Sequence, residues 1–365
     1  MSDFIPAAKP IIGADERAAV DRVLASGMLA QGPEVAAFEQ EFSAHFVNGW
    51  PVVAVNSGTS ALHLGLLASG VGPGDEVIVP SFTFAATANS VALTGARPVF
   101  ADIDLDTFCL DPAAVEAAIT PATRGIMPVH LYGHPAAMGA LCDVAARHGL
   151  AVYEDAAQAH GASLGGQPVG TFGAFGAFSL YPTKNMTSGE GGMVSVPTAE
   201  VARTVKLYRN QGMEKQYANE VVGFNNRMTD IHAAIGRVQL TKVGAWTAAR
   251  QANAAFLNAH LTGVITPVVA PGAVHVYHQY TVRVTEDRDG FVKALREEYN
   301  VGSGVYYPIP NHRLASLTAY APGLDLPVTE QAAREVVSLP VHPSLTQADL
   351  ERIVEAVNAV ARAGA

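Results

Sequence analysis

Short β-rich runs alternate with helical runs between residues 51 and 156, and this alternation constrains the fold more than any other feature of the chain. Apolar runs of the strand type stand at 52–55, 76–80, 98–103, 125–133 and 151–156. Helical stretches separate them, and strands that are joined through crossover helices pair in parallel. We therefore predict an α/β fold with a mixed, mostly parallel sheet in a large domain.

The second half of the chain is less regular. Its expected elements are a strand from Ala174, a helix over about 200–210, two helices within 228–262, strand-like stretches near 274–284 and at 301–308, and a last helix from about Gln347. This mixture is typical of a small α+β unit.

A chain of 365 residues is long enough for one large and one small domain. We predict a large domain over 1–245, which includes an N-terminal arm over 1–30, and a small α+β domain over 246–365.

Composition excludes several classes of function. The formal net charge is −10, whereas a nucleic-acid partner requires clustered Lys and Arg, so we expect no such partner. Cys109 and Cys142 cannot form a disulfide framework and stand outside any CxxC pair. The first residues lack the basic start and apolar run of a signal peptide, and no stretch reaches the length of a membrane span. We therefore expect no membrane partner and a cytoplasmic location.

Small and hydroxyl-bearing residues join the strand at 52–55 to the helix that follows. They read Asn56-Ser57-Gly58-Thr59-Ser60. Such a turn directs free backbone N–H groups and the positive end of a helix toward a phosphate. Serine and threonine are also common N-caps, and capping explains the same residues equally well.

Two later segments carry groups that suit a cofactor. Asp155 and Gln158 follow an apolar strand, at the edge where open α/β sheets bind ligands. An acid there can keep a pyridinium nitrogen protonated, although a carboxylate that caps the next helix is an alternative. Lys184 lies in a loop without other charges, which favours the lowered pKa that Schiff-base chemistry needs, while a surface lysine is the alternative. The order of the three signals within one α/β domain favours a cofactor site.

Six segments of the chain together resemble a known family. They read NSGTSALHLGLLASGVGPGDEVIVPSFTFAATANS, VHLYGHPAAM, EDAAQAHGA, FSLYPTKN, GEGGM and NNRMTDIHAAIG, and they are similar to motifs of the DegT/StrS family of nucleotide-sugar aminotransferases. The similarity runs from about Lys9 to the C-terminus. It implies a fold-type I, aspartate-aminotransferase-like transferase with pyridoxal 5'-phosphate (PLP) as its cofactor, and a homodimer with shared active sites.

The resemblance also implies roles for individual residues. Lys184 matches the catalytic lysine, which forms a Schiff base with PLP and then moves a proton. Asp155 matches the acid on the pyridine nitrogen, and Gln158 the amide that bonds the phenolate oxygen. The other matches are Gly58, Thr59, Ser60 and Ser179 at the phosphate, Phe84 on the ring face, and Asn226 at the phosphate of the neighbouring subunit. A core aromatic is an equally good interpretation of Phe84.

The implied reaction transfers an amino group, with glutamate as donor, to a nucleotide-linked keto-sugar. Segment 305–312 is similar to a loop that meets the sugar in some family members, which makes Tyr307 and His312 candidate substrate residues. Its Tyr-Pro-x-Pro-x-His form favours a 3-keto over a 4-keto sugar. A structural histidine beside a proline turn explains His312 almost as well. The other histidines lack the paired spacing of a metal site, so we expect no metal.

Several alternatives stay open. Relatives that dehydrate a deoxysugar carry histidine in place of the lysine, so Lys184 argues against that activity. An aminotransferase for a keto-cyclitol or an aminobenzoate-type intermediate would keep the lysine and differ in its substrate pocket. A non-catalytic, PLP-binding regulatory protein would need a defect, because every expected motif position is occupied. A binding module without cofactor is the remaining alternative.

Overall fold

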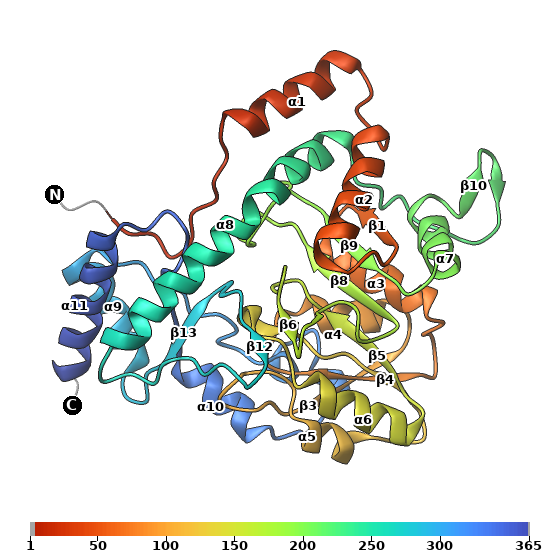
Figure 1. The fold of residues 1–365 in the computed structure, drawn as a ribbon. Coiled ribbons are helices and arrows are strands. Elements are labelled where there is room, and N and C mark those ends of the chain that lie inside the picture. The colour runs from red at the N-terminus through yellow and green to blue at the C-terminus, as the bar shows by residue number, and fades with distance from the viewer. Residues whose placement is uncertain (1–3, 364–365) are drawn as a thin grey trace.

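A seven-stranded sheet lies at the centre of the computed structural model, which describes residues 4–363 (Figure 1). The strand order is β1 (Val52–Val55), β9 (Gly192–Ser195), β8 (Phe175–Ser179), β5 (Ala151–Asp155), β4 (Thr123–Ile126), β2 (Glu76–Pro80) and β3 (Arg97–Ala101). β9 is antiparallel to both of its neighbours, and the other neighbouring strands pair in parallel. The predicted α/β fold with a mixed, mostly parallel sheet is confirmed.

Helices cover both faces of this sheet, which is why its strands are apolar on both sides. One face packs against α3 (Gly58–Ala68), α4 (Ala86–Leu93) and α7 (Ala199–Arg209). The other face packs against α2 (Pro33–Phe46), α5 (Pro112–Ala118) and α6 (Met138–His148). Strand side chains alternate between these two cores, so Val53 and Val55 face α3 whereas Val52 and Ala54 face α2.

Residues 228–262, in which we expect two helices, form one continuous helix, α8 (Asp230–His260). The prediction of a break is wrong because the segment contains no proline and its Gly236 serves packing. A Cβ on Gly236 would lie 2.4 Å from the ring of Phe38, so the glycine lets α2 and α8 approach closely. The predicted domain boundary at 245/246 falls within α8.

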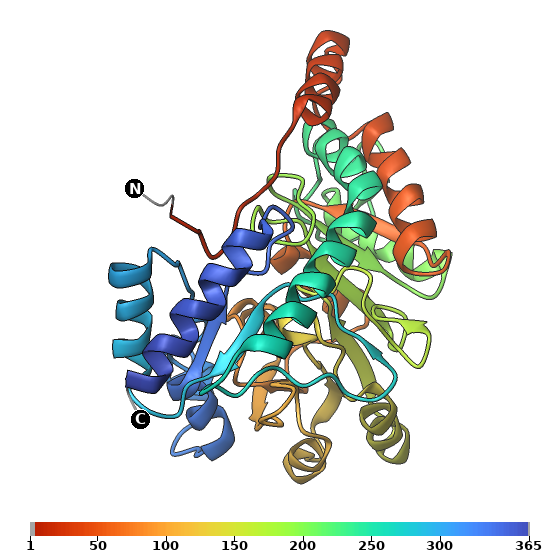
Figure 2. The same ribbon diagram turned by 60° about the vertical axis from the view of Figure 1, so that its left-hand side comes forward.

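A second core lies toward the C-terminus. It joins β13 (Tyr280–Arg283), β14 (Val336–Leu339), α9 (Arg288–Tyr299) and α11 (Gln347–Ala363) to the last turns of α8. Figure 2 shows α9 and α11, in blue, side by side at one end of the molecule. The strand expected at 301–308 is absent from the described structure, where bridges form at Val301 and Gly304 only. Tyr307 has a φ of +65°, and this left-handed backbone is incompatible with a strand.

The remaining elements are short or peripheral. They are α1 (Ala14–Ser26), η1 (Leu131–Gly133), β6 (Ser163–Leu164), β7 (Gln167–Pro168), β10 (Met213–Lys215), β11 (Ala218–Asn219), β12 (Ala273–Val274), η2 (Asn311–Arg313), η3 (Thr318–Tyr320) and α10 (Pro327–Glu335). In Figure 1, α1 lies against α8 at the outside of the molecule. Between residues 4 and 363, no helix is both long and apolar enough to cross a membrane.

Candidate active site

The candidate residues meet at one edge of the sheet. β1, β2, β5 and β8 run in the same direction, so their carboxyl ends share an edge. The segments after these ends carry Ser57–Ser60, Phe84, Asp155–Gln158 and Ser179–Lys184. Open α/β sheets bind ligands at this edge. The structure therefore brings together groups that lie more than 120 positions apart in the chain.

The turn after β1 both caps α3 and presents an anion site. Ser57 is the N-cap, and its hydroxyl accepts the Ser60 N–H at 3.1 Å. The capping interpretation of the sequence is therefore correct for Ser57. The N–H groups of Gly58 and Thr59 stand in the first turn, where a helix offers them no internal acceptor. Together with the positive end of the helix, they suit a phosphate.

Gly58 allows this turn to approach β8. A Cβ on Gly58 would lie 2.8 Å from Cβ of Ser179 and 3.1 Å from its Oγ. Gly192, at the start of β9, has the same function, since a Cβ there would lie 2.4 Å from the Ser57 carbonyl oxygen. The two glycines place the hydroxyl of Ser179 against the N-terminus of α3.

Asp155 and Glu154 are adjacent in β5 but lie in different environments. Asp155 is buried, and its carboxylate accepts hydrogen bonds from Thr87 Oγ1 at 2.8 Å and from Ala157 N–H at 3.1 Å. Burial raises the pKa of Asp155, while these hydrogen bonds and the charge of Lys184 act in the opposite direction. Glu154 instead bonds the main chain of the loop at 170–173. Of the two carboxylates, Asp155 is the one that shares the site with Lys184.

Lys184 lies in the loop that follows β8. Burial lowers its pKa from the usual lysine value to about 8, and the carboxylate of Asp155 opposes this shift. The loop is held by its own hydrogen bonds, from Lys184 N–H to the Tyr181 carbonyl at 2.9 Å and from Thr187 Oγ1 to the Leu180 carbonyl at 2.8 Å. An amine with a pKa near 8 is partly neutral at neutral pH, so it can act as a nucleophile and as a base.

Gln158 is held between two tyrosines. Its Oε1 accepts the main-chain N–H of Tyr132 at 2.7 Å, and its Nε2 donates to the hydroxyl of Tyr307 at 2.7 Å. The two tyrosine rings stack with centroids 6.4 Å apart and planes 15° apart. Tyr307, expected at the substrate, thus lies beside the residue expected at the cofactor ring.

His312, the other expected substrate residue, is buried and its ring is occupied by the protein. Its Nδ1 lies 2.7 Å from Ser81 Oγ, and its Nε2 lies 3.2 Å from Glu330 Oε1. Its exposed fraction is 1%. The interpretation as a substrate contact is therefore not supported by the structure, because neither ring nitrogen is presented to a ligand.

Phe84 and Asn226 lie at the rim of the site. Phe84 is 64% exposed, so it is not the core aromatic that the sequence also allowed. The main-chain carbonyl of Asn226 accepts the main-chain N–H of Asn56 at 2.9 Å, which places Asn226 beside the turn before α3.

Four of the other histidines, His130, His134, His160 and His232, contact neighbouring protein groups. His130 lies between Glu154 and the Ala136 N–H. His134 bonds main-chain atoms, and His232 bonds Thr229, the N-cap of α8. His160 packs among the rings of Phe42, Phe46 and Phe178. Within residues 4–363, no group of His, Cys, Asp or Glu is arranged to hold a metal ion.

Sequence reasoning missed Thr87 and Tyr132, which orient the candidate acid and amide. Thr87 stands one helical turn after Phe84, and Tyr132 lies in the run at 125–133, beyond Ile126, where β4 ends. Their positions after strand ends could have suggested proximity to Asp155. Their hydrogen bonds depend on pairing between distant strands, which no local pattern reveals.

The residues fit a phosphate-bearing aldehyde with a pyridine ring. The glycine-lined approach of α3 to Ser179 provides hydroxyl and N–H donors for the phosphate. A buried carboxylate and a lysine of lowered pKa lie at the same edge of the sheet. These are the groups that a ring nitrogen and an aldehyde carbon require.

Comparisons with known proteins agree with this geometry. The model of the DegT/DnrJ/EryC1/StrS aminotransferase family matches residues 10–358. The dTDP-3-amino-3,4,6-trideoxy-alpha-D-glucose transaminase of Streptomyces venezuelae is 43% identical over 97% of this chain and 94% of its own length. The UDP-N-acetyl-3-dehydro-alpha-D-glucosamine 3-aminotransferase of Acidithiobacillus ferrooxidans is 42% identical over 84% of this chain and 83% of its own.

A solved structure extends the comparison to the cofactor. NtdA of Bacillus subtilis, with bound cofactor PMP, superposes with a TM-score of 0.89 at 31% identity, and the match covers 99% of this chain and 87% of NtdA. The chain therefore belongs to the DegT/DnrJ/EryC1/StrS aminotransferase family and is a PLP-dependent aminotransferase.

Proposed function

We propose that this chain transfers an amino group from glutamate to the keto group at C3 of a nucleotide-linked sugar. The observation that carries the proposal is the placement of Lys184, with its lowered pKa, beside Asp155 at the phosphate-suited edge of the sheet in a member of this family. The names of the Streptomyces and Acidithiobacillus relatives both specify a 3-amino sugar, which supports C3 over C4.

Bound PLP supplies an electron-withdrawing ring. The chain's residues bind and orient the cofactor and the substrate, and they move one proton. We assign the proton transfer to Nζ of Lys184, because a group with a pKa near 8 both accepts and releases a proton near neutral pH. Asp155 keeps the ring nitrogen protonated, and Gln158 donates to the ring oxygen. The hydrogen bonds from Thr87 and Ala157 orient Asp155 for this task.

We assign phosphate binding to the N-terminal turn of α3 and to the end of β8. The donor set consists of the N–H groups of Gly58 and Thr59 and the hydroxyls of Thr59, Ser60 and Ser179. The Ser60 hydroxyl donates to Asn56 Oδ1 at 2.7 Å in the structure and would exchange this partner for the phosphate. Phe84 stacks on the ring face, and its 64% exposure leaves the aromatic surface accessible for that contact.

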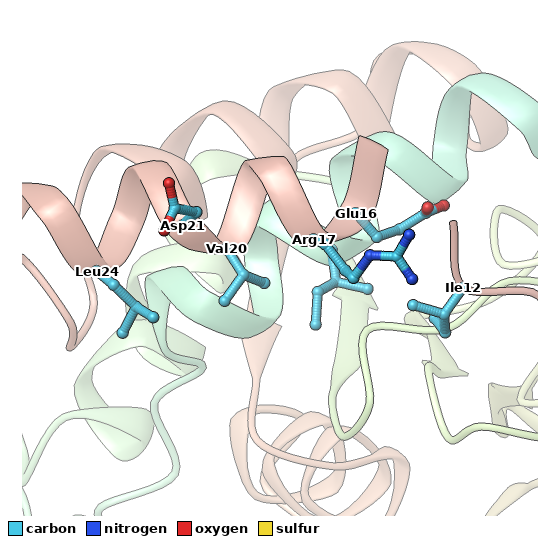
Figure 3. Close-up of a pocket in the computed structure, with 7 residues that line it drawn as sticks. Ile12, Glu16, Arg17, Val20, Asp21 and Leu24 are labelled. Atoms are coloured by element: carbon cyan, nitrogen blue, oxygen red, sulfur yellow. The ribbon is translucent and has the colours of Figure 1, made fainter. Parts of the chain in front are cut away.

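We also propose a homodimer in which Asn226 binds the phosphate of the neighbouring subunit. The position of Asn226 beside Asn56 supports a phosphate site close to the subunit boundary. Apolar side chains along α1 support the association. Ile12, Val20 and Leu24 line a groove of about 270 Å³ with Ile235 of α8, and the charged Arg17 and Asp21 border it (Figure 3). Exposed apolar patches with a polar rim are typical of protein–protein contacts.

The first experiment is an absorbance spectrum with PLP and then with glutamate. Wild type, Lys184→Ala and a control, Lys293→Ala, are compared, because Lys293 is an exposed lysine of α9. We expect a visible band in wild type and control that bleaches with glutamate, and no such band in Lys184→Ala. Identical spectra in all three proteins would refute the role of Lys184.

The second experiment tests the acceptor. The glutamate-treated enzyme is offered nucleotide-linked 3-keto and 4-keto sugars and a keto-cyclitol, and the product is analysed by mass and by NMR. We expect amination of the 3-keto sugar. Turnover of the cyclitol alone would assign the chain to the alternative substrate class, and bleaching by glutamate without any acceptor turnover would leave the sugar assignment without support.

A further inference from the structure

We propose that Tyr307 is a positioning residue whose hydroxyl orients the Gln158 amide for the cofactor ring, and that a contact between His312 and Ser81 holds Tyr307 in place. This inference rests on the proposed function, because it takes the ring oxygen to be the target of Gln158.

The hydrogen bonds of Gln158 determine which way its amide faces. Oε1 accepts the Tyr132 main-chain N–H and Nε2 donates to Tyr307, each at 2.7 Å. An amide nitrogen carries two hydrogens, so one remains for a second acceptor after the bond to Tyr307. If the hydroxyl of Tyr307 were removed, the nitrogen would lose the partner that fixes this direction.

Both tyrosines that hold Gln158 have an uncommon backbone conformation. The φ angle is +57° at Tyr132 and +65° at Tyr307. Bulky residues with positive φ persist only where the surrounding structure enforces them, and they concentrate at functional sites. Here the enforcing contacts are visible, since the two rings stack and Phe82 meets the Tyr307 ring edge-on at 5.7 Å.

His312 and Ser81 connect the Tyr307 loop to the end of β2. Ser81 Oγ accepts the His312 main-chain N–H at 3.0 Å and lies 2.7 Å from His312 Nδ1. The Asn311 N–H donates to the Ser81 carbonyl at 2.9 Å. Within the described residues, Nδ1 is the acceptor available to the proton of the buried Ser81 hydroxyl, so the neutral His312 ring carries its hydrogen on Nε2, which faces Glu330 at 3.2 Å.

This arrangement explains why His312 is buried although its loop borders the site. One ring nitrogen contacts Ser81, which follows β2, and the other contacts Glu330 of α10. Ser81 and α10 flank the loop that carries Tyr307. His312 therefore acts through Tyr307 rather than on a substrate.

The test is the pH titration of the visible absorbance of PLP-loaded protein. Hydrogen bonding to an anionic ring oxygen favours the deprotonated form, so its loss raises the midpoint. For Tyr307→Phe we expect a shift of about one pH unit upward, and a lower kcat with a nearly unchanged KM for glutamate. Tyr132→Phe is the matched control, because the main-chain N–H of Tyr132, rather than its hydroxyl, bonds Gln158. We expect its midpoint to stay at the wild-type value.

The contact at His312 is tested by two substitutions. His312→Asn keeps an acceptor near the position of Nδ1, whereas His312→Leu removes both ring nitrogens. We expect the asparagine variant to retain a midpoint near wild type and the leucine variant to shift as Tyr307→Phe does. A role in folding alone would lower thermal stability without moving the midpoint.

The outcomes separate this inference from the proposed function. If wild type never forms a visible band with PLP, the proposed function fails. If the band forms normally and Tyr307→Phe leaves its midpoint unchanged, or Tyr132→Phe moves it equally, the inference about Tyr307 is overturned. A wild-type midpoint in His312→Leu would refute the role of the His312 contact.

Discussion

Glu154→Gln should destabilise the fold and leave the site chemistry nearly intact, whereas Asp155→Asn should do the reverse. Successive side chains of a strand point to opposite faces, so these adjacent carboxylates of β5 meet different partners. Asp155 faces Thr87 and Lys184. Glu154 is fully buried and holds the loop at 170–173 by accepting its N–H groups.

The size of the effect follows from the hydrogen bonds of Glu154. Oε1 accepts the N–H groups of Phe172 and Gly173, at 2.6 and 3.0 Å. Oε2 accepts the Gly170 N–H at 2.6 Å and faces His130 Nε2 at 3.0 Å. The Nδ1 atom of this histidine accepts a main-chain N–H, so in the neutral ring Nε2 carries the hydrogen and donates.

A glutamine can keep one pair of these hydrogen bonds, but its NH₂ group then faces two donors. Loss of two hydrogen bonds to a charged acceptor, at about 1.5–3 kcal/mol each, gives a destabilisation of about 3–6 kcal/mol. That is a large part of the about 5–15 kcal/mol by which folded domains are stable. We therefore expect Glu154→Gln to unfold at markedly lower urea concentration.

Asp155→Asn is the matched control, since it removes the same charge from the next residue. An asparagine can still accept the Ala157 N–H, and the hydroxyl of Thr87 can rotate to accept from its NH₂ group. We expect a small change in unfolding free energy but a loss of most glutamate-dependent bleaching of the PLP-loaded enzyme. Equal destabilisation of the two variants, or full stability in Glu154→Gln, would refute this division between the carboxylates.

Four further predictions follow from the structure. The rate at which PLP attaches covalently to the apo protein should rise with pH through a midpoint near 8, because burial lowers the pKa of Lys184 to about 8 and the neutral amine reacts. Stopped-flow absorbance measures this rate. A midpoint at the ordinary lysine pKa would contradict the prediction. The contribution of Lys184 to the stability of the apo protein should rise as pH goes from about 8 toward the unfolded lysine value of about 10.4, because folded Lys184 holds fewer protons there. The difference in urea unfolding between wild type and Lys184→Met, followed against pH, isolates this contribution from that of Cys109, whose raised pKa acts in the opposite direction. Gly58→Ala should weaken PLP binding by about tenfold, or about 1.4 kcal/mol, because its Cβ would lie 2.8 Å from that of Ser179. Equilibrium titration with PLP measures this change, and an unchanged affinity would mean that the turn shifts freely. Asp230→Ala should cost about 2–4 kcal/mol in urea unfolding, because its buried carboxylate accepts three main-chain N–H groups at the start of α2.

Much of the fold and the location of the site could be predicted from local patterns. Apolar runs bounded by small or polar residues mark strand ends, and parallel strands bring those ends to one edge. Asp155 and Lys184 were therefore found because Asp155 ends such a run and Lys184 lies in the loop that follows another. The capping turn at Ser57 was recognised for the same reason, since an N-cap is a local signal.

Interactions between distant segments could not be predicted in this way. The continuity of α8 depends on a glycine that packs against Phe38 rather than on the helical pattern itself. The left-handed backbone of Tyr307 is incompatible with the strand expected at 301–308, and it is enforced by the rings of Phe82, which follows β2, and of Tyr132. His312 lies in a motif that is similar to a substrate-contacting loop. Its hydrogen-bond partners Ser81 and Glu330, which come from distant segments, show that its ring instead contacts the protein.

The groups that orient Asp155 and Gln158 come from segments that lie far apart in the chain. Asp155 is held by a helix after β2, and Gln158 by the segments after β4 and before α10. Donors that are already oriented need no reorganisation when charge develops on a bound ring, which is the main way in which such sites lower a barrier. Substitutions that loosen these supports should therefore lower kcat more than they raise KM, while substitutions at the exposed rim, such as at Phe84, should act on affinity first.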